Sequence, residues 1–172
     1  MSASRPSNIV LDVQHGDLTR IQADVLVNTP ATTDKDLTKC GQVSKAFCKT
    51  GGDEMQKLYK QVFSDSEDLM VTVSCGQLKC GSVFHMRIPT MKRLSYPKLG
   101  DQIYRCLQKA SEQDATSIAF PTVGCGKLGY DAGRVTDCFK QAVKKHSADD
   151  VCSLTKVCRS QQLFLSPLSG TA

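Results

Sequence analysis

The chain has 172 residues, of which 40% are hydrophobic and 23% charged, and it carries a formal net charge of +5 at pH 7. This length suits one domain with its own core, and the composition excludes a disordered or fibrous protein. No apolar run reaches the roughly 18 residues that span a bilayer, and the start lacks a secretory signal, so we expect an intracellular protein, cytoplasmic or nuclear, with no membrane partner.

The first elements along the chain are predicted strands. Apolar residues alternate at Ile9, Leu11 and Val13, which is typical of a half-buried strand. The run from Ala23 to Val27 is short and mostly apolar, which indicates a fully buried strand. His15 to Arg20 forms the turn between them, so the chain opens as strand, turn and strand.

A helix and two further strands follow. Gly51 and Gly52 precede a helix that begins at Asp53, because acidic residues suit a first turn and apolar residues follow at helical spacing. The runs from Leu69 to Ser74 and from Ser82 to Ile88 are predicted strands, and the glycines between them mark their connection.

The second half of the chain alternates helices and strands. From Asp101 to Glu112, apolar residues recur every three to four positions, which predicts a helix with one buried face. Ser117 to Val123 indicates a buried strand, and a glycine-rich loop leads from it to a second amphipathic helix, Asp131 to Lys145. Val151 to Val157 is the predicted last strand, whereas Gln161 to Ala172 shows little periodicity.

Strands interspersed with amphipathic helices predict an α/β fold. We expect a three-layer α/β/α sandwich around a mixed, mainly parallel central sheet. No internal repeat, low-complexity tract or linker divides the sequence, so residues 1–172 are expected to form a single domain.

The nine cysteines predict neither a disulfide framework nor a zinc site. Their number is odd, their spacing is scattered, and nothing indicates export. The nearest pair, Cys75 and Cys80, has four residues between its members, and His15, His85 and His146 lie far apart in the sequence. We therefore expect small buried thiols and no metal.

The segment GCGKLG places Gly124, Gly126 and Gly129 between a predicted strand and a predicted helix. Glycines there permit unusual backbone angles, so amide groups can point at phosphate oxygens beside a helix N-terminus. The alternative is a plain strand-to-helix turn. The spacing also fits a nicotinamide dinucleotide site, but Asp149 and Asp150, the acids about twenty positions on, precede the next apolar run instead of ending it.

A second candidate site follows the first predicted strand. Asp17, in the segment GDLT, can accept hydrogen bonds from an amino group such as that of adenine, and Asn28 can donate and accept at a sugar hydroxyl. Each residue also has a structural alternative. Asp17 would cap a turn, and Asn28, which precedes Thr29 and Pro30, would end a strand.

Five motifs occur in a fixed order along the chain. They are GDLT, ADVLVN, LTKCGQVSKAF with a following pair of glycines, CGQLKCGSVFH and FPTVGCGKLGY. Over residues 8–157 this order resembles the macrodomain family of ADP-ribose-binding modules. The resemblance is greatest to the macrodomains of multi-module PARP-type ADP-ribosyltransferases, and it implies one domain of a larger protein.

The resemblance also implies which residues bind the ligand. Asp17 would bind the adenine amino group, and Leu18 would present its backbone nearby. Backbone amides of the second loop would wrap the diphosphate, opposed by the first loop around Gly41. We therefore predict a site for ADP-ribose, with no catalytic residue, cofactor or metal, formed by Asp17, Leu18, Asn28, Gly41, Gln42, Val43, Gly124, Cys125, Gly126, Lys127 and Leu128.

Several positions depart from the family pattern. At the positions of the three glycines that are common in the first loop, this sequence has Cys40, Gly41 and Gln42, so only the central glycine is kept. The second asparagine of the family's NAAN-like run, which touches the distal ribose, is Ala31 here. The acid that hydrolytic members carry after the first loop falls at Ser44, and a serine cannot replace a carboxylate as a base.

The aromatic contacts of the family are altered too. The residue that covers the distal ribose is Leu128 here, with Tyr130 two positions further on. We expect a continuous apolar strand after Leu154 and find CRSQQ instead, so no adenine-stacking residue can be assigned from that strand. Phe164 is the nearest candidate, and the alternative is that it packs in the core.

We expect a non-catalytic reader of ADP-ribose, free or attached to a protein, because the adenine and diphosphate positions are intact and the catalytic ones are not. Two alternatives remain open. A degenerate macrodomain would serve as a protein or nucleic-acid contact surface, which the filled first loop and Ala31 would suit. An ADP-ribosyl hydrolase would keep the pocket and activate water through substrate phosphate or Asn28. A monomer is the expected oligomeric state.

Overall fold

The computed structural model describes residues 8–31, 34–64, 69–89, 94–123 and 129–161. Within them lies a six-stranded sheet in the order β1-β6-β5-β2-β4-β3. Neighbouring strands are parallel except β3, which runs antiparallel to β4 at one edge, and this confirms the mixed, mainly parallel sheet. The strands are β1 (Val10–His15), β2 (Val25–Asn28), β3 (Met70–Val73), β4 (Ser82–His85), β5 (Ser117–Phe120) and β6 (Lys156–Gln161).

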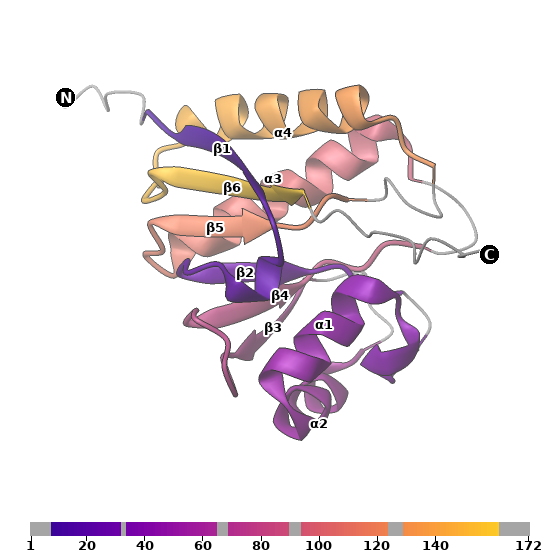
Figure 1. The fold of residues 1–172 in the computed structure, drawn as a ribbon. Coiled ribbons are helices and arrows are strands. Elements are labelled where there is room, and N and C mark those ends of the chain that lie inside the picture. The colour runs from indigo at the N-terminus through magenta and orange to yellow at the C-terminus, as the bar shows by residue number, and fades with distance from the viewer. Residues whose placement is uncertain (1–7, 32–33, 65–68, 90–93, 124–128, 162–172) are drawn as a thin grey trace.

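Helices cover both faces of this sheet, which confirms the three-layer α/β/α prediction (Figure 1). One face packs α1 and α2 against residues such as Leu26 and Val83, and the other packs α3 and α4 against residues such as Val25 and Val27. Successive strand residues point to opposite faces, so these strands are buried on both sides. None of the described helices is long and apolar enough to cross a bilayer. The helices are the 3-10 helices η1 (Leu18–Arg20) and η2 (Leu37–Lys39) and the α-helices α1 (Gln42–Gly51), α2 (Asp53–Val62), α3 (Tyr96–Glu112) and α4 (Ala132–Ser147).

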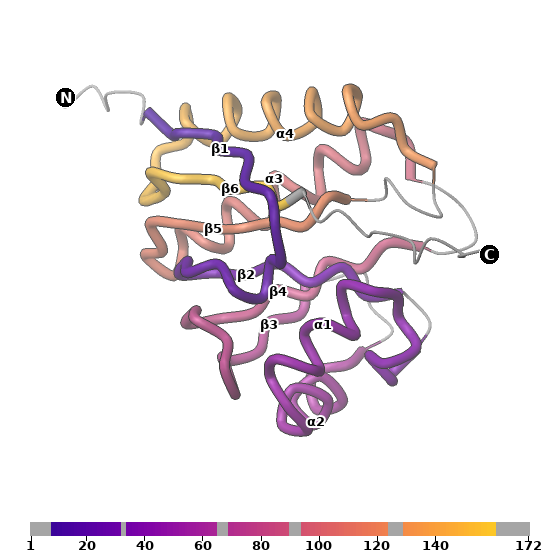
Figure 2. The backbone as a smooth tube through the Cα atoms, viewed as in Figure 1, coloured from indigo at the N-terminus to yellow at the C-terminus, as the bar shows by residue number. Residues whose placement is uncertain are grey.

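The first and last strands of the described chain lie side by side (Figure 2). β6 lies between β1 and β5 and is parallel to both. Ile9 and Leu11 pack partly against the core, as their alternation predicts, but Val13 is 45% exposed. Its exposure follows from the position of β1 at the edge of the sheet.

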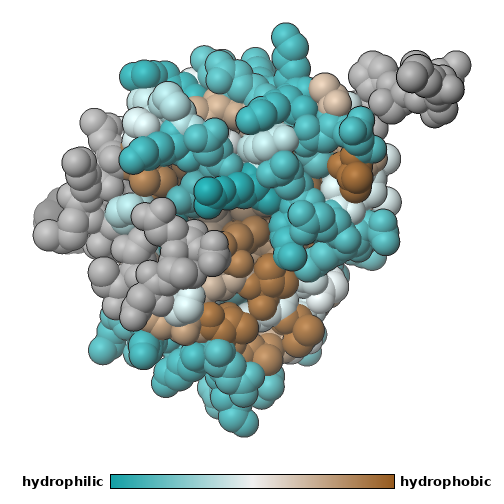
Figure 3. Space-filling model, turned by 180° about the vertical axis from the view of Figure 1, so that it is seen from behind, coloured by the Kyte–Doolittle hydropathy of each residue, from teal (hydrophilic) through white to brown (hydrophobic). Residues whose placement is uncertain are grey.

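The opposite edge of the sheet exposes apolar side chains. Viewed from the side opposite to Figure 1, hydrophilic residues predominate in the upper part of the surface and a hydrophobic patch lies below them (Figure 3). Val71 of β3 packs partly against the same core as α3 and α4, and Val73 on the same side of that strand is 63% exposed. The α3–α4 layer therefore does not extend fully over β3.

Two helix predictions were incomplete. Helix α1 was missed because its sequence is mostly polar, and only Ser44, Phe47 and Gly51 in it are buried. Helix α3 begins at Tyr96 instead of Asp101, since Ser95 is its N-cap and accepts a hydrogen bond from the backbone amide of the third residue. The cap and a proline in the first turn both favour a helix start. They lie before the residues whose apolar periodicity predicted the helix, so the predicted start was too late.

The last strand lies later in the sequence than predicted. β6 begins at Lys156, and Val151 is 63% exposed outside it. The polar residues that were expected to interrupt an apolar strand belong to β6 instead, and Arg159 and Ser160 are buried. Each has internal partners: the Arg159 guanidinium donates to Oγ1 of Thr136 and lies 5.9 Å from the Phe139 ring centroid, and Oγ of Ser160 donates to a turn carbonyl at 2.6 Å.

Candidate functional site

Two neighbouring strands in the middle of the sheet send their following segments to opposite faces. β2 leads to α1 on one face, whereas β5 leads to α4 on the other. Because the two strands are parallel, these connections begin at the same edge of the sheet. This divergence is the topological switch point, outside the carboxyl ends of the strands, at which open α/β sheets bind ligands.

The N-terminus of α1 lies on the β2 side of this switch point. Gly41 is the N-cap, with φ 105° and ψ −179°, and it provides no side-chain hydrogen bond. The first helical hydrogen bond joins the Lys45 amide to the Gly41 carbonyl at 3.1 Å, so the amides of Gln42, Val43 and Ser44 precede it. No acidic side chain lies in this turn, which leaves its partial positive charge available to an anion.

Asp17 follows β1 and caps the short helix η1. Its Oδ1 accepts hydrogen bonds from the amide and the hydroxyl of Thr19, at 2.9 and 2.7 Å. Its Oδ2 lies 3.9 Å from Nε of Arg20, and the Asp17 side chain is 35% exposed beside a surface depression of about 410 Å³. The turn-cap role is therefore present, and the second oxygen faces Arg20. Leu18 is buried, and ligand binding by either residue stays a prediction.

Asn28 ends β2 and is fully buried. Its Oδ1 accepts a hydrogen bond of 2.9 Å from Ser44, and its Nδ2 lies 3.2 Å from Nδ1 of His85. Nε2 of His85 lies 3.0 Å from the hydroxyl of Thr72, and burial lowers the pKa of His85 to about 3. The Asn28 side chain therefore joins the first turn of α1 to β4 through Ser44 and His85, and its predicted contact with a ribose hydroxyl stays a prediction.

His85 and Thr72 connect to this part of the sheet, and neither was predicted as a site residue. His85 directly follows a buried apolar pair at the end of β4, and a polar residue there is the signal that could have identified it. Ala31, at the position of the family's second asparagine, is 8% exposed and bridges Ile88. It presents no polar side chain.

The second predicted loop lies outside the described residues. Gly124, Cys125, Gly126, Lys127 and Leu128 fall there, as does Phe164, so their predicted roles stay predictions. Directly after that loop the hydroxyl of Tyr130 donates to the Leu94 carbonyl at 3.1 Å, and Asp131 caps α4 by accepting from the Arg134 amide at 2.9 Å. The loop therefore leads into a well-anchored helix start.

Seven of the described cysteines are poor nucleophiles, because the pKa of each thiol is raised. Burial raises the pKa of the Cys48 thiol to about 11. Burial is also the largest cause of a raised pKa at Cys40, Cys75, Cys80, Cys106, Cys138 and Cys158. Within the described ranges, no three or more histidine, cysteine, aspartate or glutamate side chains are grouped to hold a metal ion.

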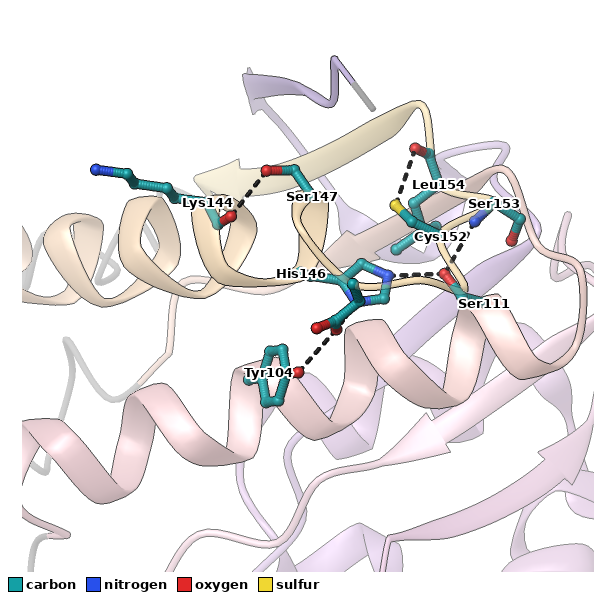
Figure 4. Close-up of polar contacts among 9 residues, drawn as sticks. Tyr104, Ser111, Lys144, His146, Ser147, Cys152, Ser153 and Leu154 are labelled. Carbon is teal, nitrogen blue, oxygen red and sulfur yellow. Dashed lines mark hydrogen bonds and ion pairs between the residues drawn. The ribbon is translucent and has the colours of Figure 1, made fainter. Parts of the chain in front are cut away.

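A serine, a histidine and an aspartate meet at the C-terminal end of α4 (Figure 4). Nε2 of His146 lies 2.7 Å from Oγ of Ser111, and its Nδ1 lies 2.9 Å from a carboxylate oxygen of Asp149, which also accepts from Tyr104 at 2.7 Å. Ser111 and His146 are buried, and Oγ of Ser111 also accepts from the Ser153 amide. This arrangement joins α3, α4 and the segment before β6, and a substrate cannot reach its hydroxyl.

Comparison with known proteins supports the predicted resemblance. Protein mono-ADP-ribosyltransferase PARP14 of Homo sapiens is 30% identical over 146 residues, which are 80% of this chain and 8% of that protein. The chain therefore spans a small part of PARP14. The ADP-ribose glycohydrolase of Archaeoglobus fulgidus is 28% identical over 165 residues, which are 86% of this chain and 84% of that enzyme.

Solved structures support the same fold. A Trypanosoma brucei macrodomain in complex with ADP-ribose has a TM-score of 0.74 and 22% identity, and the match covers 88% of this chain and 63% of that one. The family model of the Macro domain matches residues 30–139, which are more than half of the chain. Together with the three-layer fold, this match shows that the chain belongs to the macro domain family.

Proposed function

We propose that the chain binds ADP-ribose, free or attached to a protein, and holds it without reaction. The observation that carries the proposal is the N-terminus of α1, which Gly41 leaves without a side-chain cap at the topological switch point of the sheet. A diphosphate suits those amides because it is anionic and needs donors that approach closely. Asp17, which follows the parallel strand β1, separated from β5 by β6, would accept from the adenine amino group.

The macro domain family and the ADP-ribose in the Trypanosoma brucei neighbour support this choice of ligand. The absence of reaction rests on Ser44, which stands where hydrolytic members carry an acid. Its hydroxyl is buried and donates to Asn28, so it neither contacts the cleft nor serves as a base. Hydrolysis is the main competing function, since the relatives include an ADP-ribose glycohydrolase.

The binding proposal is tested by calorimetric titration of ADP-ribose into the wild type and into Asp17→Asn. The variant keeps an oxygen that can cap η1 but replaces Oδ2 by an amide nitrogen, which cannot accept from adenine. Asp36 is the matched control, because it caps η2 through the amide and the hydroxyl of Thr38 in the same way. We expect wild-type binding that Asp17→Asn weakens and Asp36→Asn preserves. No heat from the wild type up to roughly millimolar ADP-ribose would reject the proposal.

The competing hydrolase function is tested by release of label from a mono-ADP-ribosylated protein. We expect the wild type to release no more label than a Gly126→Glu variant, whose second loop is predicted to be blocked. Release that is faster with the wild type than with this variant would establish hydrolysis.

A polynucleotide contact surface on α3 and α4 is the second candidate function. These two helices carry seven basic and three acidic side chains, which accounts for most of the net charge of +5. A groove of about 460 Å³ between them contains Tyr96 and Tyr104, and cations lie over both rings: Arg134 at 3.8 Å and Lys145 at 4.2 Å. Aromatic rings beside cationic groups are features of single-strand binding.

This second candidate predicts binding of a single-stranded RNA oligonucleotide that weakens as salt is raised. Fluorescence anisotropy with a labelled oligonucleotide measures it. Lys145→Gln should reduce the affinity, whereas Asp17→Asn should not. Binding that Asp17→Asn abolishes would assign the RNA to the ADP-ribose cleft instead.

A further inference from the structure

A chain of hydrogen bonds crosses the sheet from its edge to the first turn of α1. It runs from Thr72 in β3 to His85 in β4 at 3.0 Å, from His85 to Asn28 in β2 at 3.2 Å, and from Asn28 to Ser44 in α1 at 2.9 Å. All four residues are buried, and the last three are wholly inaccessible to solvent. This series of hydrogen bonds ends at Ser44, in the same first turn of α1 whose amides are proposed to bind the diphosphate.

We infer that His85 is a positioning residue for the ADP-ribose site, acting through Asn28 and Ser44 on the first turn of α1. The inference rests on the proposed function, because it concerns the affinity of that same site. His85 does not touch the ligand in this account. It fixes the orientation of the Asn28 amide, which in turn fixes the serine hydroxyl.

The donors and acceptors determine in which direction each hydrogen bond of this series points. The amide nitrogen of Asn28 can only donate, so Nδ1 of His85 accepts, and the ring proton resides on Nε2 and is donated to Thr72. This tautomer directs Oδ1 of Asn28 toward Ser44, whose hydroxyl donates to it. A proton on Nδ1 would face the Asn28 amide hydrogens and break the chain.

The surroundings of the ring favour this neutral form. His85 is fully buried, and its ring centroid lies 4.9 Å from that of Tyr59, which restricts the ring plane. Burial without an acidic partner lowers the pKa of His85 to about 3, so the imidazole is neutral at physiological pH. The series of hydrogen bonds therefore keeps the same direction at this pH.

The first turn of α1 needs such support because its donors are backbone amides. Backbone amides cannot adjust by changing rotamers. Gly41, which precedes them, has no side chain that could hold this turn in place. Precise placement of a binding group depends on the residues that pack behind it. In this turn, Ser44 is the buried polar residue that connects the helix to β2.

Two substitutions of His85 separate positioning from packing. In His85→Asn, the side-chain oxygen can reach the position of Nδ1 and accept from Asn28. In His85→Gln, the longer side chain reaches the position of Nε2 and can bond to Thr72, but Asn28 loses its acceptor. Both variants remove the same aromatic ring, so the loss of packing is matched.

The measurements are ADP-ribose affinity by calorimetry, thermal unfolding, and the amide NMR shifts of Gln42 and Val43 without ligand. We expect His85→Gln to weaken binding roughly tenfold and to shift both amide resonances, and His85→Asn to keep affinity within about threefold, with similar losses of Tm. Equal affinities and unmoved resonances in both variants would overturn the inference. A wild type that does not bind ADP-ribose would reject the proposed function, while the resonances would still test the positioning.

Ser44→Ala provides a second test at the other end of the series of hydrogen bonds, should His85→Gln fail to fold. It should weaken ADP-ribose binding as strongly as His85→Gln and shift the same two resonances, because both substitutions release the first turn of α1. Wild-type affinity in Ser44→Ala with unmoved resonances would overturn the inference.

Discussion

Oγ of Ser44 donates a hydrogen bond of 2.9 Å to Oδ1 of Asn28, and neither side chain is exposed to solvent. This contact joins the first turn of α1 to the end of β2, two elements that belong to different layers. The serine hydroxyl is used in this contact, at the position where the resemblance to the family places the acid of hydrolytic members. The serine therefore has a structural role at this position.

The first prediction concerns the stability that this contact provides. Ser44→Ala leaves Oδ1 of Asn28 buried without its donor, so we expect the free energy of unfolding to fall by about 1–3 kcal/mol in urea denaturation. Ser82→Ala is the control, because its hydroxyl makes only a 3.3 Å contact with Gln113 near the surface. That variant should remain within about 0.5 kcal/mol of the wild type. Equal losses would show that the Asn28 contact contributes nothing specific.

A second prediction concerns the backbone of Gly41. A side chain there would meet no atom within 4 Å, but its angles of φ 105° and ψ −179° lie in a region that only glycine adopts readily. Gly41→Ala should therefore cost about 1–3 kcal/mol and weaken ADP-ribose binding. Gly100→Ala, in α3 and equally free of contacts, should instead stabilise the chain by about 0.5–1 kcal/mol. Thermal unfolding of the pair decides, and a harmless Gly41→Ala would refute the assigned geometry.

A third prediction is a decrease in stability below neutral pH. Burial lowers the pKa of His85 to about 3 in the folded chain, whereas an exposed histidine titrates near 6.5. As the pH falls below about 6.5, the unfolded chain binds a proton that the folded chain does not, so the stability that is complete above this pH is lost progressively toward pH 3. At about pH 5 the loss from this residue is about 2 kcal/mol.

Urea midpoints measured between about pH 7.5 and about pH 5 check this loss. His85→Asn removes the titrating group while it keeps an acceptor for Asn28, so its stability should decrease less over this range. A variant whose stability decreases as much as that of the wild type would rule out His85 as the cause.

A fourth prediction concerns the buried charge in β6. Arg159 is 5% exposed, and its Nε is buried without a hydrogen-bond partner among the described residues. Arg159→Met keeps most of the apolar stem, and Thr136 retains its own bond to the Ala132 carbonyl, so the cost should stay within about 1 kcal/mol. Arg159→Ala leaves a cavity beside Phe139 and should cost about 2–4 kcal/mol. Similar costs for both variants in urea denaturation would assign the stability to the charge instead of the packing.

Some of the fold could be predicted because local sequence patterns depend on burial. The central strands β2, β4 and β5 are short apolar runs, and α4 has a clear apolar face, so their existence followed from the sequence. Helix α1 and strand β6 could not be located in this way. Ser44, Arg159 and Ser160 are polar but buried, and only their partners in distant segments make that burial favourable.

The same division applies to the candidate site. The motif order was enough to assign the macro domain family and to indicate Asp17 and Gly41, because turns and helix starts require particular residue types at fixed spacing. The tertiary structure decided which neighbours Asn28 contacts, since Ser44 and His85 are brought together only when β2, β4 and α1 pack. A side chain that can bind a ligand can equally bind its neighbours, and which it does depends on burial, which sequence spacing alone does not determine.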